Sequence, residues 1–216
     1  MSGLFRRTKK GFLDADVDLL ANNIKAVLVD LAAMITAASP HVKAITGATN
    51  ANPSVLTITG HGWSTGHIVS ISGVLGNTAV NGRYRFTSTG ANTGTLTDII
   101  TGAAIAGNGA YTSGGYAINL TTLDFLDDID ASARLATSGN MTGKNTDNGR
   151  FDCDNFTWTA VPTGDTGQAA MFYDDTPGAE SGKFVICVDD AASNLPVNTN
   201  NGDIEYQVHA NGLFDL

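Results

Sequence analysis

Charged side chains almost disappear from one internal stretch of the chain, and this gap limits the fold more than any motif does. Between residues 44 and 117 the charged residues are Arg83, Arg85 and Asp98, whereas Asp is frequent on both sides. A change of composition at two points predicts one domain inserted into another. We therefore expect a discontinuous base domain of residues 1–43 and 118–216, and an inserted module of residues 44–117.

Both parts show the sequence pattern of antiparallel β-structure. Short apolar or alternating runs are separated by turn signals rich in Gly, Asn, Asp and Pro. Four such runs are expected as strands of the base, within residues 149–161, 168–175, 183–190 and 203–210, and about five in the insert, within residues 55–59, 67–74, 82–89, 94–99 and 109–118. The predicted fold class is mainly β: an antiparallel β-sandwich or barrel base that carries a small inserted β-barrel module.

The beginning of the chain predicts one short N-terminal helix followed by a strand. Asp14 or Asp16 can cap a helical turn whose apolar positions begin at Val17. Residues 24–31 are rich in β-branched and Leu side chains, which indicates a buried strand. A helix is the alternative there, because the stretch to Ala38 contains no Gly or Pro and several Ala.

The charge of the chain bears on its partners. A formal net charge of −9 opposes nucleic-acid binding, which needs a basic face that displaces counterions. No run approaches the roughly 18–20 apolar residues that span a bilayer, so we expect no membrane partner. Four basic residues nevertheless lie within the first ten positions: Arg6, Arg7, Lys9 and Lys10. This basic arm is interpreted either as docking on an acidic neighbour or as a disordered, solubilising terminus.

Two histidines, His61 and His67, flank a turn in the insert and raise the question of a metal site. A catalytic zinc site usually needs three protein ligands, and the insert offers one carboxylate, Asp98, and no Cys. We therefore expect His61 to make a local hydrogen bond in the turn, with Trp63 packed over the end of the barrel. No metal or other cofactor is predicted.

Acidic runs at residues 13–18 and 124–130 have the alternating carboxylates of calcium loops. An EF-hand loop that begins at Asp14 would need Gly at its sixth position and Glu at its twelfth, where Leu19 and Lys25 stand. Helix caps and solvated turns are the expected roles of these carboxylates. The two cysteines, Cys153 and Cys187, are too few for a disulfide framework and are expected in the core.

The sequence contains no recognisable catalytic constellation, and we expect no enzyme. Nucleophile-elbow, zinc-protease, P-loop and dinucleotide-binding motifs are absent. Aromatic residues of the insert, Trp63, Tyr84, Tyr111 and Tyr116, suggest another role: a platform that stacks on host-surface glycans. The alternative is that these rings fill a small barrel that needs large side chains.

Two stretches resemble known phage proteins. The base resembles a family of small virion structural proteins of tailed bacteriophages, through an Asp-rich opening, "IKAVLVD" at residues 24–30, "FLDDI" at 125–129 and "FDCD" at 151–154 before an aromatic strand. The insert is similar to a β-module repeated in phage structural proteins, through "HG" at 61–62, "TG" at 65–66, "VSISGV" at 69–74 and "NGRYRF" at 81–86.

The resemblance implies a non-enzymatic virion protein made in the cytoplasm of the bacterial host. The expected role is capsid decoration, in which the base binds the major capsid protein or other virion proteins and the insert projects outward. A cyclic homo-oligomer, with a trimer favoured, fits such symmetric positions. The alternatives are a neck, collar or tail component, or a module that binds host-surface glycans.

Overall fold

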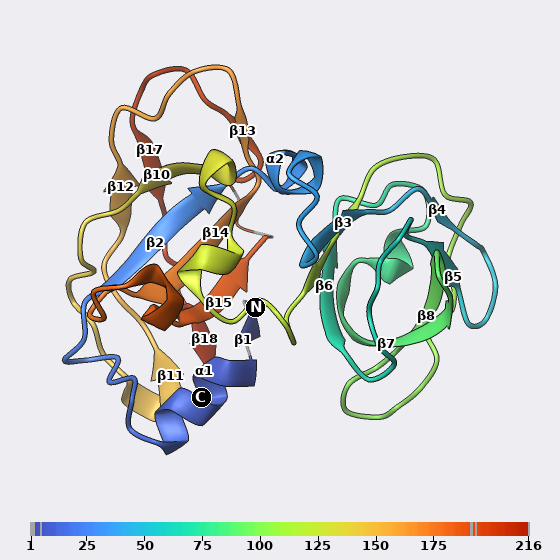
Figure 1. Cartoon of the computed structure of the whole chain (residues 1–216), viewed down its shortest axis with the longest axis horizontal. Helices are drawn as coiled ribbons and strands as arrows, with labels where there is room; N and C mark the ends of the chain where they lie inside the picture. Colours follow the sequence, from blue (N-terminus) through green and yellow to red (C-terminus); the bar gives the residue numbers. More distant parts are fainter. Residues whose placement is uncertain (1–2, 5, 191, 193, 216) are drawn as a thin grey trace. The chain divides into compact units, whose positions relative to one another are not determined.

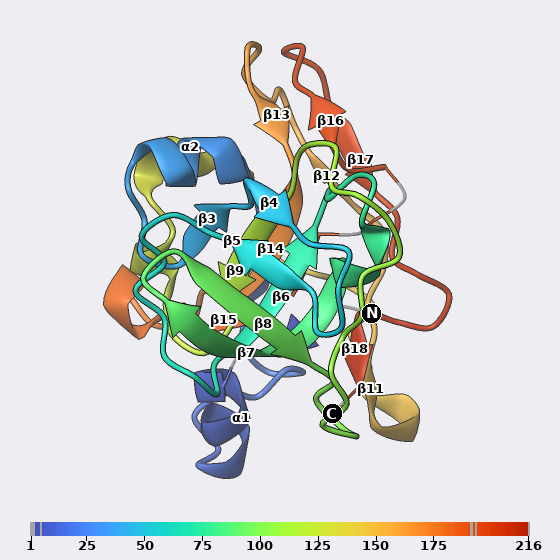
Figure 2. The same ribbon diagram turned by 90° about the vertical axis from the view of Figure 1, so that its right-hand side faces the viewer.

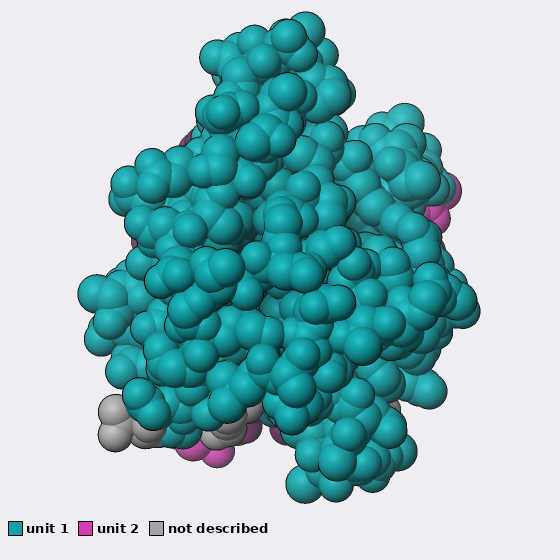
Figure 3. Space-filling model, turned by 90° about the vertical axis from the view of Figure 1, so that its left-hand side faces the viewer, with its two compact units in different colours: residues 1–37, 123–216 teal, residues 38–122 magenta. Residues whose placement is uncertain are grey.

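The chain folds into two compact units. The computed structural model describes residues 3–215 except residues 5, 191 and 193. Residues 1–37 and 123–216 form the base, and residues 38–122 form the insert (Figure 1; Figure 3). The insert is longer at both ends than the expected 44–117, because β3 (Val42–Ala44) and β9 (Tyr116–Asn119) pair with each other inside it.

The base is built from antiparallel strands. Its main sheet has the order β1-β15-β14-β2-β10. These strands are β1 (Gly3–Leu4), β2 (Ile24–Val29), β10 (Arg134–Thr137), β14 (Ala169–Asp174) and β15 (Val185–Asp189). β14 lies in the middle, pairs with β2 and β15, and has all six residues buried. Burial from both sides explains why its sequence, AAMFYD, is a nearly continuous apolar run.

Three two-stranded ladders complete the base. They pair β11 (Arg150–Phe151) with β18 (Phe214–Asp215), β12 (Phe156–Trp158) with β17 (Ile204–Tyr206), and β13 (Thr166–Gly167) with β16 (Val197–Asn198). The β12–β17 ladder packs on the main sheet, since Phe172 of β14 meets Phe156 and Tyr206 edge-on at 6.0 and 5.6 Å between ring centroids. The mainly β, antiparallel sandwich class predicted from the sequence is confirmed.

The short N-terminal helix exists, but it begins earlier than expected. α1 spans Arg6–Leu13, so Asp14 and Asp16 follow the helix instead of capping its start. Buried Thr8 and Gly11 lie on the side of α1 that docks on the base, and the Thr8 hydroxyl donates a 2.6 Å hydrogen bond to the Val185 carbonyl. The contact attaches α1, which carries the basic residues, to the base.

The apolar run from residue 24 to 38 divides into a strand and a helix. β2 ends at Val29, and α2 (Leu31–Thr36) follows immediately. Asp30 causes the change, because its carboxylate accepts hydrogen bonds from the backbone N–H groups of Ala32 and Ala33 and so caps α2. The predicted strand is therefore correct up to Val29, and the helix alternative applies to the residues beyond Asp30.

The insert is a closed seven-stranded β-structure (Figure 2). Its order is β3-β9-β6-β7-β8-β5-β4. The remaining strands are β4 (Gly47–Ala48), β5 (Val55–Thr57), β6 (Ile68–Ser72), β7 (Gly82–Gly90) and β8 (Thr93–Thr97). β3 and β4 stand at opposite ends of the order yet are nearly consecutive in the chain. The bent segment 42–48 therefore closes the sheet: Ile45 N–H bonds to Gly115 O, and Thr46 N–H bonds to Thr57 O.

The core of the insert fills this closed sheet with aliphatic side chains and two large rings. The fully buried members include Leu56, Ile58, Val69, Phe86 and Leu96. Phe86 lies on β7 between Arg85, which is exposed, and Thr87, which is half-buried. This alternation is the period of two that the sequence shows in the stretch GRYRFTST.

Candidate functional site

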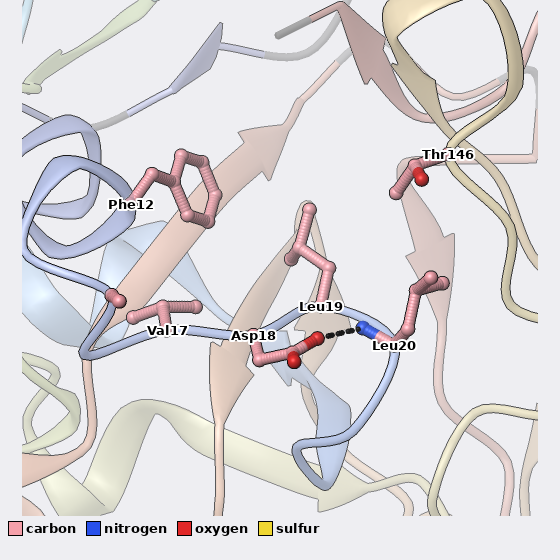
Figure 4. Close-up of a pocket in the computed structure, with 7 residues that line it drawn as sticks. Phe12, Val17, Asp18, Leu19, Leu20 and Thr146 are labelled. Carbon is pink, nitrogen blue, oxygen red and sulfur yellow. Dashed lines mark hydrogen bonds between the residues drawn. The ribbon is translucent and has the colours of Figure 1, made fainter.

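The base carries an apolar groove beside α1. Its volume is about 370 Å³. The groove is lined by Phe12, Ala15, Val17, Asp18, Leu19, Leu20 and Thr146 (Figure 4). Thr146 comes from a part of the chain remote in sequence, while the other six residues belong to the end of α1 and the segment after it. The groove is therefore a surface that folding assembles.

The backbone reverses direction after α1 and places residues 17–20 opposite Phe12. The N–H groups of Asp16 and Val17 both donate to the Gly11 carbonyl, at 2.9 and 3.3 Å. A side chain at Gly11 would crowd this turn, since a Cβ there would lie 3.0 Å from Cγ2 of Val17. Residue 15 has a left-handed backbone with φ 59°, which completes the reversal.

A second turn shapes the floor of the groove. The Asp18 carboxylate accepts hydrogen bonds from the N–H groups of Leu20 and Ala21, at 2.9 and 3.0 Å. This Asx turn holds Leu19 buried and Leu20 half exposed at the opening (Figure 4). Asp18 thus both shapes the groove and places a carboxylate in its wall.

Two large apolar side chains in the segment that forms the groove are exposed to water. Leu13, the last residue of α1, is 87% exposed, and Leu20 is 50% exposed. In the described part of the chain, the other large apolar side chains with comparable exposure are Leu75 at 56% and Ile100 at 93%, both in the insert. In the base, both therefore belong to the segment of the groove: Leu20 lines the hollow, and Leu13 directly follows Phe12, another lining residue.

The predicted basic arm lies on α1, because Arg6–Leu13 is helical. The Arg7 guanidinium lies 4.0 Å from Asp124 Oδ2 and 4.8 Å from the centroid of the Phe125 ring. Lys10 pairs with Asp14 one turn further along the chain. Lys9 is exposed and has no ion pair within the described residues. The side chain of Arg6 lies outside the described residues.

The carboxylate of Asp18 lines the groove, and two more carboxylates precede it in the chain. Asp14, Asp16 and Asp18 are exposed and lie within five consecutive residues, directly after the basic helix. An apolar hollow with a carboxylate in its wall can bind an apolar side chain that is flanked by basic groups. Sequence analysis missed this site, because the apolar residues of the groove were assigned to a helix that does not form there.

The two histidines that flank the predicted turn, His61 and His67, are engaged in hydrogen bonds within the insert. His61 is buried, its Nδ1 accepts a 2.9 Å hydrogen bond from the Trp63 N–H, and its Nε2 donates to the Gly90 carbonyl at 2.8 Å. The predicted turn hydrogen bond of His61 is confirmed. His67 Nδ1 accepts from the side-chain amide of Asn119 at 2.9 Å. Within the described residues, no group of three or more His, Cys, Asp or Glu side chains is arranged to hold a metal ion.

The four aromatic residues proposed as a glycan platform do not form one exposed surface. Trp63 is buried in the core of the insert, and its Nε1–H donates to the Pro40 carbonyl at 2.8 Å. Tyr84 and Tyr111 pack against the same core, and their hydroxyls bond to backbone carbonyls of Ala79 and Ile45. Tyr116 is half-buried. The positions of Trp63, Tyr84 and Tyr111 agree with the alternative interpretation, in which these rings fill a small barrel.

The Asp-rich runs serve as caps and turns. Asp128 accepts from the N–H groups of Asp124 and Phe125, and Asp130 accepts from Ser132 N–H and Oγ. Hydrogen bonds from Ser132 lower the pKa of Asp130, as those from Thr101 lower the pKa of Asp98. These local bonds stabilise the ionised carboxylates in the turns themselves.

Both cysteines are free and buried. The Cys153 thiol lies 3.7 Å from the sulfur of Met141, in the base core that also contains Cys187. Burial, together with the nearby charges of Asp152 and Asp154, raises the pKa of Cys153 to about 12. The thiol is therefore protonated at neutral pH, which suits a packing role and opposes nucleophilic chemistry.

Comparison with known proteins assigns this chain to no family. No protein-family model and no curated protein matches the sequence. None of the described helices has the length and apolar content that crossing a membrane requires.

Proposed function

We propose that this chain is a non-enzymatic structural protein of a tailed-bacteriophage virion, specifically a decoration protein of the head. In this proposal the base attaches to the major capsid protein, and the insert is displayed for contacts with the surroundings. The protein is made in the cytoplasm of the bacterial host and acts in the virion as a cyclic homo-oligomer, with a trimer favoured. The sequence resemblance of both units to phage structural proteins motivates the proposal.

One structural observation supports it above others: the insert is a closed module with paired ends. Val42 pairs with Ile118, the Asn119 N–H donates to the His41 carbonyl at 2.7 Å, and His41 Nδ1 lies 3.0 Å from Thr122 Oγ1. The chain therefore leaves the base and returns to it through neighbouring strands. A base that carries a separately closed module suits a protein that attaches through one unit and displays the other.

The chemistry of the described side chains agrees with this role. Buried and half-buried polar groups shape turns: the side chains of His61, Asn77 and Asn81 all bond to backbone groups of the insert. Asn81, for example, both accepts from Val74 N–H and donates to Val74 O. Side chains committed to loop geometry rigidify a module, which is useful in a structural protein.

Electron cryomicroscopy of virions of the phage that encodes the chain tests the proposal. We expect density for both units at symmetric positions on the head, with several hundred copies in each virion. A copy number of a dozen or fewer, with density at the neck or tail, would replace head decoration by a collar or tail role. Absence of the protein from both head and tail would refute the proposal.

A further inference from the structure

We propose that the groove beside α1 is a contact between copies of this chain, in which Leu13 and the basic face of α1 of one copy meet the groove of another. The inference names the surface for the expected homo-oligomer. It does not depend on the location of the protein in a virion, so the two proposals can fail separately.

Two exposed Leu side chains supply the apolar part of the proposed contact: Leu20 in the groove and Leu13 at the end of α1. Leu20 lines the hollow together with Phe12, Val17 and Leu19, and exposed Leu13 directly follows Phe12 in the chain. Removing such side chains from water stabilises a contact by roughly 25 cal/mol per Å² of apolar surface. The hollow is open (Figure 4), and the Leu13 side chain of a second copy is of a size that such a hollow accepts.

Charge complementarity identifies the occupant as a second copy. Residues 6–13 contain four basic residues and no carboxylate, whereas residues 14–18 contain three Asp and no basic residue. The same short segment therefore offers a cationic helix and an anionic border to the groove. When two copies meet through this segment, Lys9 of one copy can approach Asp16 or Asp18 of the other.

The charge of the rest of the base makes this contact specific. The insert holds three basic residues and one carboxylate, so with −9 for the whole chain the base carries −11. Bases of that charge repel one another over most of their surface. α1 is the part of the base where positive charge is concentrated, so a contact that places α1 over the partner's Asp residues reduces this repulsion most.

Symmetry allows every copy to use both halves of the surface. In a two-fold dimer the helix of each copy covers the groove of the other, and in a closed ring each helix docks in the next groove. Either arrangement buries Leu13 and Leu20 of every copy. The number of copies is an outcome of the experiment, whereas the surface is the proposal.

The first test measures self-association of the full chain by sedimentation over a range of concentrations. We expect the protein to form oligomers, and Leu13→Ser with Leu20→Ser to weaken association at least tenfold. The matched control is Leu75→Ser with Ile100→Ser, which removes two similarly exposed apolar side chains from the insert and should leave association unchanged. All four positions are exposed, and circular dichroism checks that each variant folds.

The second test exchanges charges between copies. Lys9→Glu and Asp16→Lys should each weaken self-association several-fold, and so should an increase of NaCl to 0.5 M, because salt screens exposed charges. An equimolar mixture of the two variants should associate more tightly than either variant alone, because one of the two cross-copy pairs is restored with reversed sign. Such rescue between different molecules is expected of a contact between copies and not of a merely structural role.

Three results would overturn the proposal. They are a wild-type chain that stays monomeric at all concentrations tested, association that survives loss of Leu13 and Leu20, and association that the insert control weakens instead. A groove that binds only the capsid would appear as a monomeric chain whose capsid binding is lost in the Leu13 and Leu20 variant. That result would refute self-association while leaving the virion role standing.

Discussion

The Tyr206 hydroxyl donates a hydrogen bond of 2.5 Å to Oδ2 of Asp189, and this bond ties the β12–β17 ladder to the end of β15 in the main sheet. The Tyr206 ring is buried and stacks on Phe156, with 4.9 Å between ring centroids and 14° between ring planes. A polar link at the border of an aromatic core fixes how the two layers of the base meet. Removal of this hydrogen bond should therefore destabilise the base as a whole.

Tyr206→Phe tests this link. The variant keeps the ring but removes the donor to a carboxylate, so we expect the free energy of unfolding to fall by about 1–2 kcal/mol. Urea unfolding followed by circular dichroism measures the change. Tyr116→Phe is the control, since the Tyr116 hydroxyl has no hydrogen bond within the described residues. A Tyr206→Phe variant as stable as the wild type would show that the link contributes nothing.

Alkaline pH should destabilise the base through groups that ionise more easily when unfolded. Burial, with a smaller contribution from Asp175, raises the pKa of Tyr173 to about 12, and burial raises that of Cys153 to about 12. Their ordinary values are 10.0 and 9.0. Between the unfolded and folded pKa values the folded state binds more protons, so the stability from these groups is complete below pH 9 and falls as pH rises from 9 to 12.

Unfolding by urea at a series of pH values between 8 and 11 measures this loss. Each group that ionises only in the unfolded state adds about 1.4 kcal/mol per pH unit to the slope. Cys153→Ala should make the slope shallower from pH 9 upward, and Tyr173→Phe from pH 10 upward. A stability that stays constant up to pH 11 would contradict the prediction.

The carboxylate of Asp175 forms ion pairs with two lysines: Lys25 on β2, and Lys183, which lies just before β15. Its carboxylate lies 2.6 Å from Lys25 Nζ and 2.7 Å from Lys183 Nζ, and all three side chains are partly buried. Partial burial raises the pKa of Asp175, but hydrogen bonds and charges from Lys183 and Lys25 outweigh it and lower the pKa below its usual value. The folded state therefore holds this proton less tightly than the unfolded state does.

Asp175→Asn should lower the free energy of unfolding at pH 7 by about 1–3 kcal/mol, because two partly buried ammonium groups lose their counter-charge. In the wild type the stabilisation by Asp175 is present above its unfolded pKa and is lost as pH falls below about 4. The variant should lack this part of the acid dependence. Asp14→Asn, which removes the exposed Lys10 pair, is the control and should cost under about 0.5 kcal/mol.

His61 holds the connection between β5 and β6, and His61→Ala tests that role. The buried N–H of Trp63 would lose its acceptor and the Gly90 carbonyl its donor, so we expect a loss of about 1–3 kcal/mol in the stability of the insert. His209→Ala is the control, because His209 is exposed and its Nδ1 bonds only to the nearby Asn211 N–H. Equal effects of the two substitutions on thermal unfolding would refute a special role for His61.

The sequence predicts an element best where buried and exposed side chains alternate within a short stretch of chain. The alternation of Ile204 and Tyr206 about Glu205 predicted β17, and its buried and exposed residues lie as expected. The groove could not be predicted in this way, since Thr146 reaches it from more than 120 residues away from Leu20. The same limitation explains why the start of α1 was misplaced. In the sequence, an Asp that follows a helix cannot be distinguished from an Asp that caps one. The contact that distinguishes them is the hydrogen bond of Thr8 to Val185, which is remote in the chain.

The ends of the insert were missed for a related reason. β3 and β4 have the sequences VKA and GA, which are too short and too weakly apolar to show a period. They are strands because partners elsewhere in the chain complete their hydrogen bonds: β9 for β3, and β5 for β4. Tertiary pairing, not local preference, places the boundaries of this module.

The paired ends of the insert predict that it folds when it is cut from the base. Residues 38–122 contain all seven strands and the full 42–48 segment that closes the sheet, so the isolated fragment should unfold cooperatively. A fragment of residues 44–117 loses the Val42–Ile118 pair, the His41–Asn119 hydrogen bond and the end of β9, and it should be much less stable or unfolded. Circular dichroism and the spread of amide resonances in NMR spectra distinguish the two fragments. If both fragments fold equally well, pairing of the ends is not what completes the module; if neither folds, the insert depends on the base for its stability.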